Sequence, residues 1–176
     1  MKREFTASVY IVEKESVLLI LHRKLGVWLP AGGHIDPDEL PSDAAIREAK
    51  EETGLDVELM AQENVWVPQM TNGKSIPRPY LCLLEEIPEY KDVAAHQHID
   101  FVFVGRKVGG ALKHNLRECD GVAWFTLEEL KNEKALYEET RSVTMHILSN
   151  LYPNNLKNWI LADVKALALE RSSTAQ

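Results

Sequence analysis

The start of the chain alternates short apolar runs with short polar links. Residues 5–12 and 16–21 are rich in β-branched and aliphatic side chains, and the charged residues 13–15 separate them. Two runs of this length around a polar link are typical of strands joined as a hairpin. The sequence therefore predicts a β-hairpin over residues 5–21.

A loop and a helix are predicted next. Residues 29–33 contain one proline and two glycines, so we expect a loop whose backbone conformation or close approach to a neighbour would exclude larger side chains. Residues 42–53 have no Gly or Pro, and Gly54 follows directly. This pattern predicts a helix of about three turns that ends at Gly54.

The rest of the chain predicts strands and then helices. The expected strands are 55–59, 65–67, 80–84, 99–104 and one that ends at 124–125. Thr126 and Glu129 have the spacing of a capping box, which predicts a short helix. Two longer helices are expected at 137–151 and 156–169. Strands around one early helix, with helices at the end, predict an α+β fold or a layered α/β/α sandwich.

Length and composition indicate a single domain. The chain has 176 residues, of which 45% are apolar and 27% are charged, as expected for a globular domain that buries its own core. We expect the domain to span residues 1–170 and residues 171–176 to form a disordered tail. The sequence has no apolar run of the roughly 18 residues that a membrane span needs and no secretory signal, so the expected location is the cytoplasm.

The charge balance narrows the expected partners. Lys and Arg number 20 against 27 acidic residues, which gives a formal net charge of −7, and the chain contains no basic run. Binding to duplex nucleic acid by broad neutralisation of phosphates is therefore not expected. A small anionic ligand is compatible with this charge, because a bound divalent cation can overcome the repulsion locally.

The predicted helix carries three acidic residues on one face. Glu48, Glu51 and Glu52 have the spacing i, i+3 and i+4, and like charges at this spacing destabilise a helix unless a positive charge lies among them. Mg²⁺ or Mn²⁺ would supply that charge, since hard cations prefer oxygen ligands. The alternative interpretation is a helix face that simply points into solvent.

The other side chains of this helix suit packing and positioning. Ala45 and Ala49 are small and four residues apart, so the helix can lie close to a sheet. Arg47 can pair with Glu51 or reach back to Glu39 in the preceding loop. A rigid acidic helix beside a glycine-rich segment is what a metal-assisted phosphoryl site needs: a template for phosphates, a metal-activated water and a carboxylate base.

The spacing of the whole segment resembles the Nudix hydrolase signature, G-x5-E-x7-R-E-U-x-E-E-x-G-U, where U is aliphatic. The match covers residues 33–55, and only the small Ala49, at an aliphatic position, departs mildly from the pattern. The residues at the prescribed positions are Gly33, Glu39, Arg47, Glu48, Glu51, Glu52 and Gly54.

The resemblance implies an α/β/α sandwich with a mixed sheet and hydrolysis of a diphosphate linkage. By position, Glu48 and Glu52 would bind the divalent metal together with the backbone carbonyl of Gly33. Glu51 would be a further ligand or the base, and Arg47 is carried over with the catalytic residues. Arg47 and Glu39 would also form a structural pair that orients helix and loop, and Gly54 would end the helix.

Substrate contacts are expected outside the signature. The candidates are Arg23, which follows the second predicted strand, Glu118, and the pair His96 and His98. Some members of the family take the base from a later loop, where Glu118 and Asp120 are the candidates here.

The segment around His96 has an alternating pattern. In a strand, His96, His98 and Asp100 would share one face and the apolar residues between them the other. The polar face would form a wall of the active-site cleft. The alternatives are a hydrogen-bonded surface strand and a transition-metal site, the latter disfavoured by neighbouring acids that suit Mg²⁺.

The leading functional prediction is a Mg²⁺-dependent or Mn²⁺-dependent pyrophosphohydrolase. Its substrate would be a nucleoside triphosphate or another derivative of a nucleoside diphosphate, and the protein would be a monomer or a homodimer. Two alternatives stay open. One is a non-catalytic nucleotide-sensing module on the same fold, which would have no need for three mutually repelling carboxylates. The other is a prenyl-diphosphate isomerase, a class that usually breaks the signature.

Overall fold

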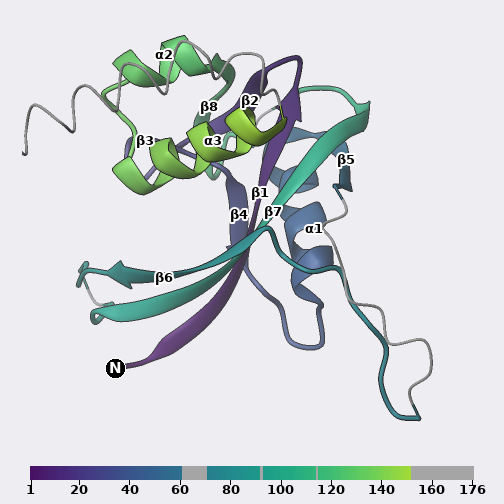
Figure 1. Ribbon diagram of the computed structural model, residues 1–176. Coiled ribbons are helices and arrows are strands. Elements are labelled where there is room, and N and C mark those ends of the chain that lie inside the picture. Colours follow the sequence, from purple (N-terminus) through teal and green to yellow (C-terminus); the bar gives the residue numbers. More distant parts are fainter. Residues whose placement is uncertain (61–70, 92, 114, 152–176) are drawn as a thin grey trace, which may run out of the picture.

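The fold is a mixed sheet with helices on both faces. The computed structural model of the protein describes residues 1–60, 71–91, 93–113 and 115–151 (Figure 1). In chain order its elements are β1 (Arg3–Glu13), β2 (Ser16–His22), β3 (Val27–Leu29), β4 (Ala31–His34), α1 (Pro41–Thr53), β5 (Leu55–Leu59), β6 (Leu81–Ile87), β7 (His96–Gly110), β8 (Cys119–Thr126), α2 (Leu127–Asn132) and α3 (Glu138–Leu151). The described helices include none that is long and apolar enough to cross a membrane.

Two long strands, β1 and β7, form the centre of the sheet. They pair in parallel, with Glu4 opposite His98 and Thr6 opposite Asp100. The remaining pairings are antiparallel: β2 and β4 with β1, β3 and β8 with β2, and β5 and β6 with β7. The sheet therefore has eight strands with β1 and β7 in the middle.

Side chains alternate along β1 and so build two separate cores. Ala7 and the residues that alternate with it pack against α1, whose Ala44, Ala45 and Ala49 are fully buried. Tyr10 and its neighbours on the other face pack against α3 through Val143, Ile147 and Leu148. In Figure 1, α1 lies on one side of β1 and β7 and α3 lies on the other. This arrangement confirms the predicted layered α+β architecture.

Several predicted elements agree with the structure. Residues 5–21 lie in the hairpin of β1 and β2, and the predicted helices 42–53 and 137–151 correspond to α1 and α3 within one residue at each end. The capping box of Thr126 and Glu129 is formed in full at the start of α2.

Other predictions differ from the structure. Residues 29–33 were expected to be a loop, but they lie mostly in strands, because β3 ends at Leu29 and β4 begins at Ala31 to pair with β1. Strand β7 is much longer than the predicted 99–104, since it pairs with β1, β5 and β6 along its length. The predicted strand 65–67, helix 156–169 and tail 171–176 lie outside the described residues.

Candidate active site

The candidate site lies where β4 approaches α1. The backbone N–H of Gly32 donates to Glu52 Oε2 at 3.0 Å, and a Cβ atom on Gly33 would overlap the carboxylate of Glu48. Gly33 is therefore needed for the close approach of strand and helix, whereas a Cβ on Gly32 would overlap Ala7 and Ser8 of the neighbouring β1. Both glycines thus allow a close approach to a neighbour, as their position in the sequence predicts.

The ends of α1 are set by local sequence. Pro41 starts the helix, where its missing N–H costs no hydrogen bond. Gly54 ends it in the left-handed conformation, with φ 74°, and its N–H donates to the carbonyl of Lys50 at 2.9 Å. A Cβ on Gly54 would also overlap the carbonyl oxygen of Ala111, so glycine is required there for two reasons.

The three carboxylates of α1 differ strongly in exposure. Glu52 is buried, with 4% of its surface exposed, whereas the side chain of Glu48 is 13% exposed and that of Glu51 is 50% exposed. The interpretation of the whole acidic face as a solvated surface is therefore wrong for Glu48 and Glu52. These two carboxylates face β4 rather than solvent.

Burial changes the acidity of both groups. It raises the pKa of Glu52 to about 8, opposed by the hydrogen bond from Gly32 and supported by the negative charges of Glu48, Glu118 and Glu51. Burial also raises the pKa of Glu48, against the effect of the neighbouring Arg47. Carboxyl groups whose pKa is raised by burial are a recurrent feature of functional sites.

Arg47 holds the acidic helix to the preceding loop. Its Nε and Nη2 donate to the two carboxylate oxygens of Glu39, both at 2.9 Å, and Nη2 also donates to the carbonyl of His34 at 3.1 Å. Its Nη1 donates to Glu48 at 2.7 Å and to Glu51 at 3.4 Å. Both partners proposed for Arg47 are therefore found. The bidentate pair with Glu39 holds the pKa of Glu39 below its usual value.

A second acidic group approaches from the segment before β8. The backbone N–H of Asn115 donates to the carbonyl of Glu52 at 3.1 Å, and the charge of Glu118 raises the pKa of both Glu48 and Glu52. Arg23 Nε donates to Asp120 Oδ1 at 2.7 Å, and the backbone N–H of Arg23 donates to the carbonyl of Glu118. The structure thus brings Glu118 and Arg23 to this side of the site.

The donor set fits a hard divalent cation. Carboxylates of Glu48, Glu51 and Glu52 come from one helix beside the backbone of Gly33, and Glu118 adds a nearby negative charge. Among the described residues, the buried Glu52 carboxylate accepts one hydrogen bond, from the N–H of Gly32. Oxygen donors with excess negative charge are what Mg²⁺ and Mn²⁺ bind.

His96, His98 and Asp100 lie on the other face of the sheet. Asp100 is buried and accepts hydrogen bonds from Thr6 Oγ1 at 3.0 Å and Ser8 Oγ at 2.6 Å. Because Phe103 packs in the core beside α1, the polar residues that alternate with it face away from α1. The predicted alternation is confirmed, and it separates the two histidines from the acidic helix.

Several residues of interest were not found by sequence reasoning. The N–H of Gly32 was not predicted to bind Glu52, although Gly32 precedes the first residue of the signature. Glu4 and His34 join His96 and His98, with His34 Nε2 and Glu4 Oε2 2.9 Å apart. No local pattern indicated this group, because its members come from three strands whose pairing the sequence does not reveal.

The comparisons with known proteins agree with this geometry. The profile of the NUDIX domain matches residues 2–147. A crystal structure of a NUDIX-family hydrolase from Clostridium perfringens is 34% identical, with a TM-score of 0.69 over 86% of this chain and 99% of that chain.

Two curated relatives carry names that state an activity. A Bacillus subtilis protein named "Putative 8-oxo-dGTP diphosphatase" is 26% identical over 125 residues, 69% of this chain and 67% of its own length. The "m7GpppN-mRNA hydrolase NUDT17" of Danio rerio is 42% identical over 55 residues, which is 27% of this chain and 18% of that protein.

Proposed function

The chain belongs to the Nudix family of hydrolases, which act on phosphorus-containing anhydrides, and we propose that within this family it is a Mg²⁺-dependent pyrophosphohydrolase of nucleotides. Mn²⁺ would serve in place of Mg²⁺. The observation that carries the proposal is the pair of carboxylates held against the glycines of β4, of which Glu52 is buried and Glu48 is largely shielded from solvent. Burial makes ionisation of Glu52 costly and so raises its pKa, whereas a cation bound to a phosphate chain would stabilise the ionised form of both carboxylates.

The residues divide into ligands and positioning groups. Glu48, Glu52 and the backbone carbonyl of Gly33 are the proposed metal ligands, with Glu51 as a further ligand or the base. Arg47 is a positioning residue in this scheme, because its bidentate pair with Glu39 fixes α1 to the loop before it. When bound, the metal would orient the phosphates and make a water molecule more acidic.

Glu51 is the first candidate for the base that accepts a proton from the attacking water. Its side chain is half exposed, so it can meet a water and a substrate, and its contact with Arg47 is long at 3.4 Å. Glu118 is the second candidate, because its charge acts on Glu48 and Glu52. Asp120 is a weaker candidate than either, since it is paired with Arg23 at 2.7 Å.

The substrate class follows from charge and from the relatives. A net charge of −7 makes a small polyphosphate a better partner than a long nucleic acid. The names of the two curated relatives mention 8-oxo-dGTP and m7GpppN-mRNA, and both of these compounds contain phosphoanhydride bonds. We propose a nucleoside triphosphate or another nucleoside diphosphate derivative, with Arg23 and Glu118 beside it.

The test is product analysis with the full-length protein and Mg²⁺. Triphosphates, oxidised triphosphates, nucleotide sugars, dinucleotides and capped RNA ends are screened for release of pyrophosphate, phosphate or a nucleoside monophosphate. Glu52→Gln should abolish turnover, whereas Glu89→Gln, at an exposed acid far along the chain, should not. Nucleotide binding without any cleavage would support the sensing alternative, and a product that keeps its diphosphate would support the isomerase.

The base is assigned by a pair of variants. Glu51→Gln and Glu118→Gln are compared by kcat as a function of pH at saturating Mg²⁺. Loss of the base should lower kcat by about 100-fold to 10,000-fold, whereas loss of a residue that only binds substrate should mainly raise KM. Equal and small effects of both variants would contradict both assignments.

A further inference from the structure

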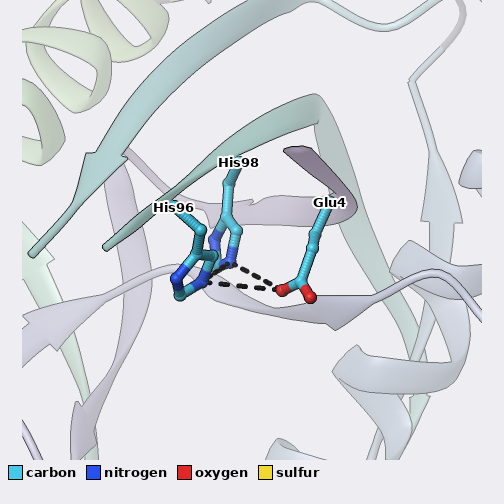
Figure 2. Close-up of side chains that lie close together, drawn as sticks. All are labelled: Glu4, His96 and His98. Carbon is cyan, nitrogen blue, oxygen red and sulfur yellow. Dashed lines mark hydrogen bonds and ion pairs between the residues drawn. The ribbon is translucent and has the colours of Figure 1, made fainter. Parts of the chain in front are cut away.

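A cluster of histidines lies on the sheet face opposite α1. It consists of His96 and His98 on β7, Glu4 on β1 and His34 on β4. Figure 2 shows the side chains of Glu4, His96 and His98 pointing toward one another from the two central strands. Because β1 and β7 are parallel, Glu4 lies directly opposite His98, and the period of two brings His96 to the same face.

The ligand atoms of this cluster converge. The Nε2 atoms of His96 and His98 are 3.1 Å apart, and they lie 3.5 Å and 3.6 Å from Glu4 Oε2. In a tetrahedral zinc site with bonds of 2.0–2.2 Å, neighbouring ligand atoms lie about 3.3 Å from one another. The three observed separations lie on either side of this value, so one ion at bonding distance from all three atoms needs only small side-chain shifts.

A backbone carbonyl orients His96 as metal sites require, and a carboxylate lies within ion-pair distance of His98. His96 Nδ1 lies 2.9 Å from the carbonyl of Ala94. A carbonyl only accepts, so Nδ1 carries the hydrogen, and the neutral ring holds the lone pair of its Nε2 toward His98 Nε2, 3.1 Å away. His98 Nδ1 lies 3.8 Å from Glu85 Oε2, which places a carboxylate behind the second histidine as well.

The carboxylate of Glu4 has separate roles for its two oxygens. Oε1 pairs with Lys2 Nζ, whereas Oε2 faces all three histidines, including His34 Nε2 at 2.9 Å. The side chains of His96, His98 and Glu4 are 11%, 16% and 23% exposed, while that of His34 is 60% exposed. The three converging groups are thus largely shielded from water, and His34 lies at the open side.

We propose that Glu4, His96 and His98 bind one divalent transition-metal ion of the zinc type, with a water in the fourth position and His34 hydrogen-bonded to the ligating oxygen of Glu4. Two imidazoles and one carboxylate are a common ligand set for zinc with an open position. The sequence disfavoured a transition metal because of neighbouring acids. The acids of α1 lie across the sheet, and among the described residues Glu4 supplies the carboxylate that converges with both histidines, while Glu85 lies behind His98.

The proposed ion is distinct from the one in the candidate active site. The cluster offers nitrogen ligands, which suit zinc, whereas α1 offers carboxylates, which suit Mg²⁺. His34 connects the two sites, because its carbonyl accepts from Arg47 Nη2 at 3.1 Å while its side chain bonds Glu4. An ion in the cluster would link β1 to β7 through its ligands. Through the hydrogen bond between Glu4 and His34 it would also restrain β4, the strand that carries Gly33.

The test is metal binding by the untagged full-length chain, freed of metals and kept in excess Mg²⁺. Co²⁺ is the probe, since it gives intense visible absorption in a tetrahedral site and weak absorption in an octahedral one, and Zn²⁺ is then added in competition. We expect one Co²⁺ per chain with the intense absorption, displaced by Zn²⁺ but not by Mg²⁺. Weak absorption, or displacement by Mg²⁺, would overturn the proposal without the need for any variant.

Variants then locate the ion. His98→Ala and Glu4→Gln should weaken Co²⁺ binding by at least about 100-fold, and His34→Ala by about 10-fold to 100-fold, as expected for an outer partner. The matched control His146→Ala, on α3 and bonded to Asn150, should bind as the wild type does. Glu48→Gln/Glu52→Gln should also bind normally, because these residues belong to the other site.

Two results would refute the location. One is binding that survives His98→Ala and Glu4→Gln, and the other is binding that is lost in Glu48→Gln/Glu52→Gln. His96→Gln provides a second, milder change at the cluster, and circular dichroism shows which variants are folded. Because none of these readouts is turnover, failure of the proposed hydrolysis would leave this test intact.

Discussion

Replacing Glu52 by Gln should stabilise the metal-free protein at neutral and alkaline pH. Glu52 is 4% exposed, and burial raises its pKa from 4.5 to about 8. The unfolded chain loses this proton above about pH 4.5, whereas the folded chain keeps it until about pH 8. Wild-type stability should therefore fall as pH rises through this window, because the folded state binds more protons.

The size of the effect follows from the pKa. One pKa unit corresponds to about 1.4 kcal/mol. Relative to low pH, Glu52 therefore destabilises the folded state by about 5 kcal/mol above pH 8, where it is ionised, and by about 3 kcal/mol at pH 7, where the folded state keeps a proton that the unfolded chain releases. Gln keeps an oxygen that can accept from the N–H of Gly32 but has no charge to desolvate. The stability advantage of Glu52→Gln should thus be near zero at pH 4.5 and largest at pH 9.

The assay is urea unfolding of both proteins in EDTA between pH 4.5 and 9. Glu51→Gln is the control, because Glu51 is half exposed and its loss should change the profile much less. Mg²⁺ should narrow the difference, since a ligand present at 100 times its Kd stabilises the wild type by about 2.7 kcal/mol and Glu52→Gln lacks a ligand. Parallel pH profiles for wild type and Glu52→Gln would refute the reasoning.

Three other changes probe the supports of the site. Gly33→Ala places a methyl group on the carboxylate of Glu48 and should weaken Mg²⁺ binding by about 10-fold or more, measured by calorimetry; unchanged affinity would contradict this close approach. Arg47→Lys loses the bidentate pair with Glu39 and should lower the free energy of unfolding by about 1–3 kcal/mol; an unchanged urea midpoint would count against it. Thr126→Ala removes the N-cap of α2 and should cost about 1 kcal/mol without altering turnover, so a loss of activity would show a role beyond capping.

The acidic helix shows how far local sequence determines structure. Its limits are encoded by Pro41 and Gly54, and the pairing of Arg47 with Glu39 is anticipated from their spacing and confirmed. The exposure of its acids is not anticipated. A spacing of i, i+3 and i+4 shows that Glu48, Glu51 and Glu52 share a face. The position of β4 decides that Glu52 is buried and Glu48 largely shielded, while Glu51 is half exposed.

The histidine cluster shows the opposite case. The alternation of His96, His98 and Asp100 correctly indicates one face of a strand, yet the same face holds two different environments. Asp100 is enclosed by the hydroxyls of Thr6 and Ser8, while the histidines meet Glu4. These partners lie more than 90 residues earlier in the chain, so their proximity depends on the parallel register of β1 and β7.

The sequence by itself determined the family, the shared face of the three acids on the helix, and the helix boundaries, because each depends on residues close together in the chain. Only the tertiary structure decided which carboxylates are desolvated by burial and which strands bring Glu4 to the histidines. Burial and strand register depend on contacts between segments that are distant in the sequence, so a local sequence pattern does not predict them.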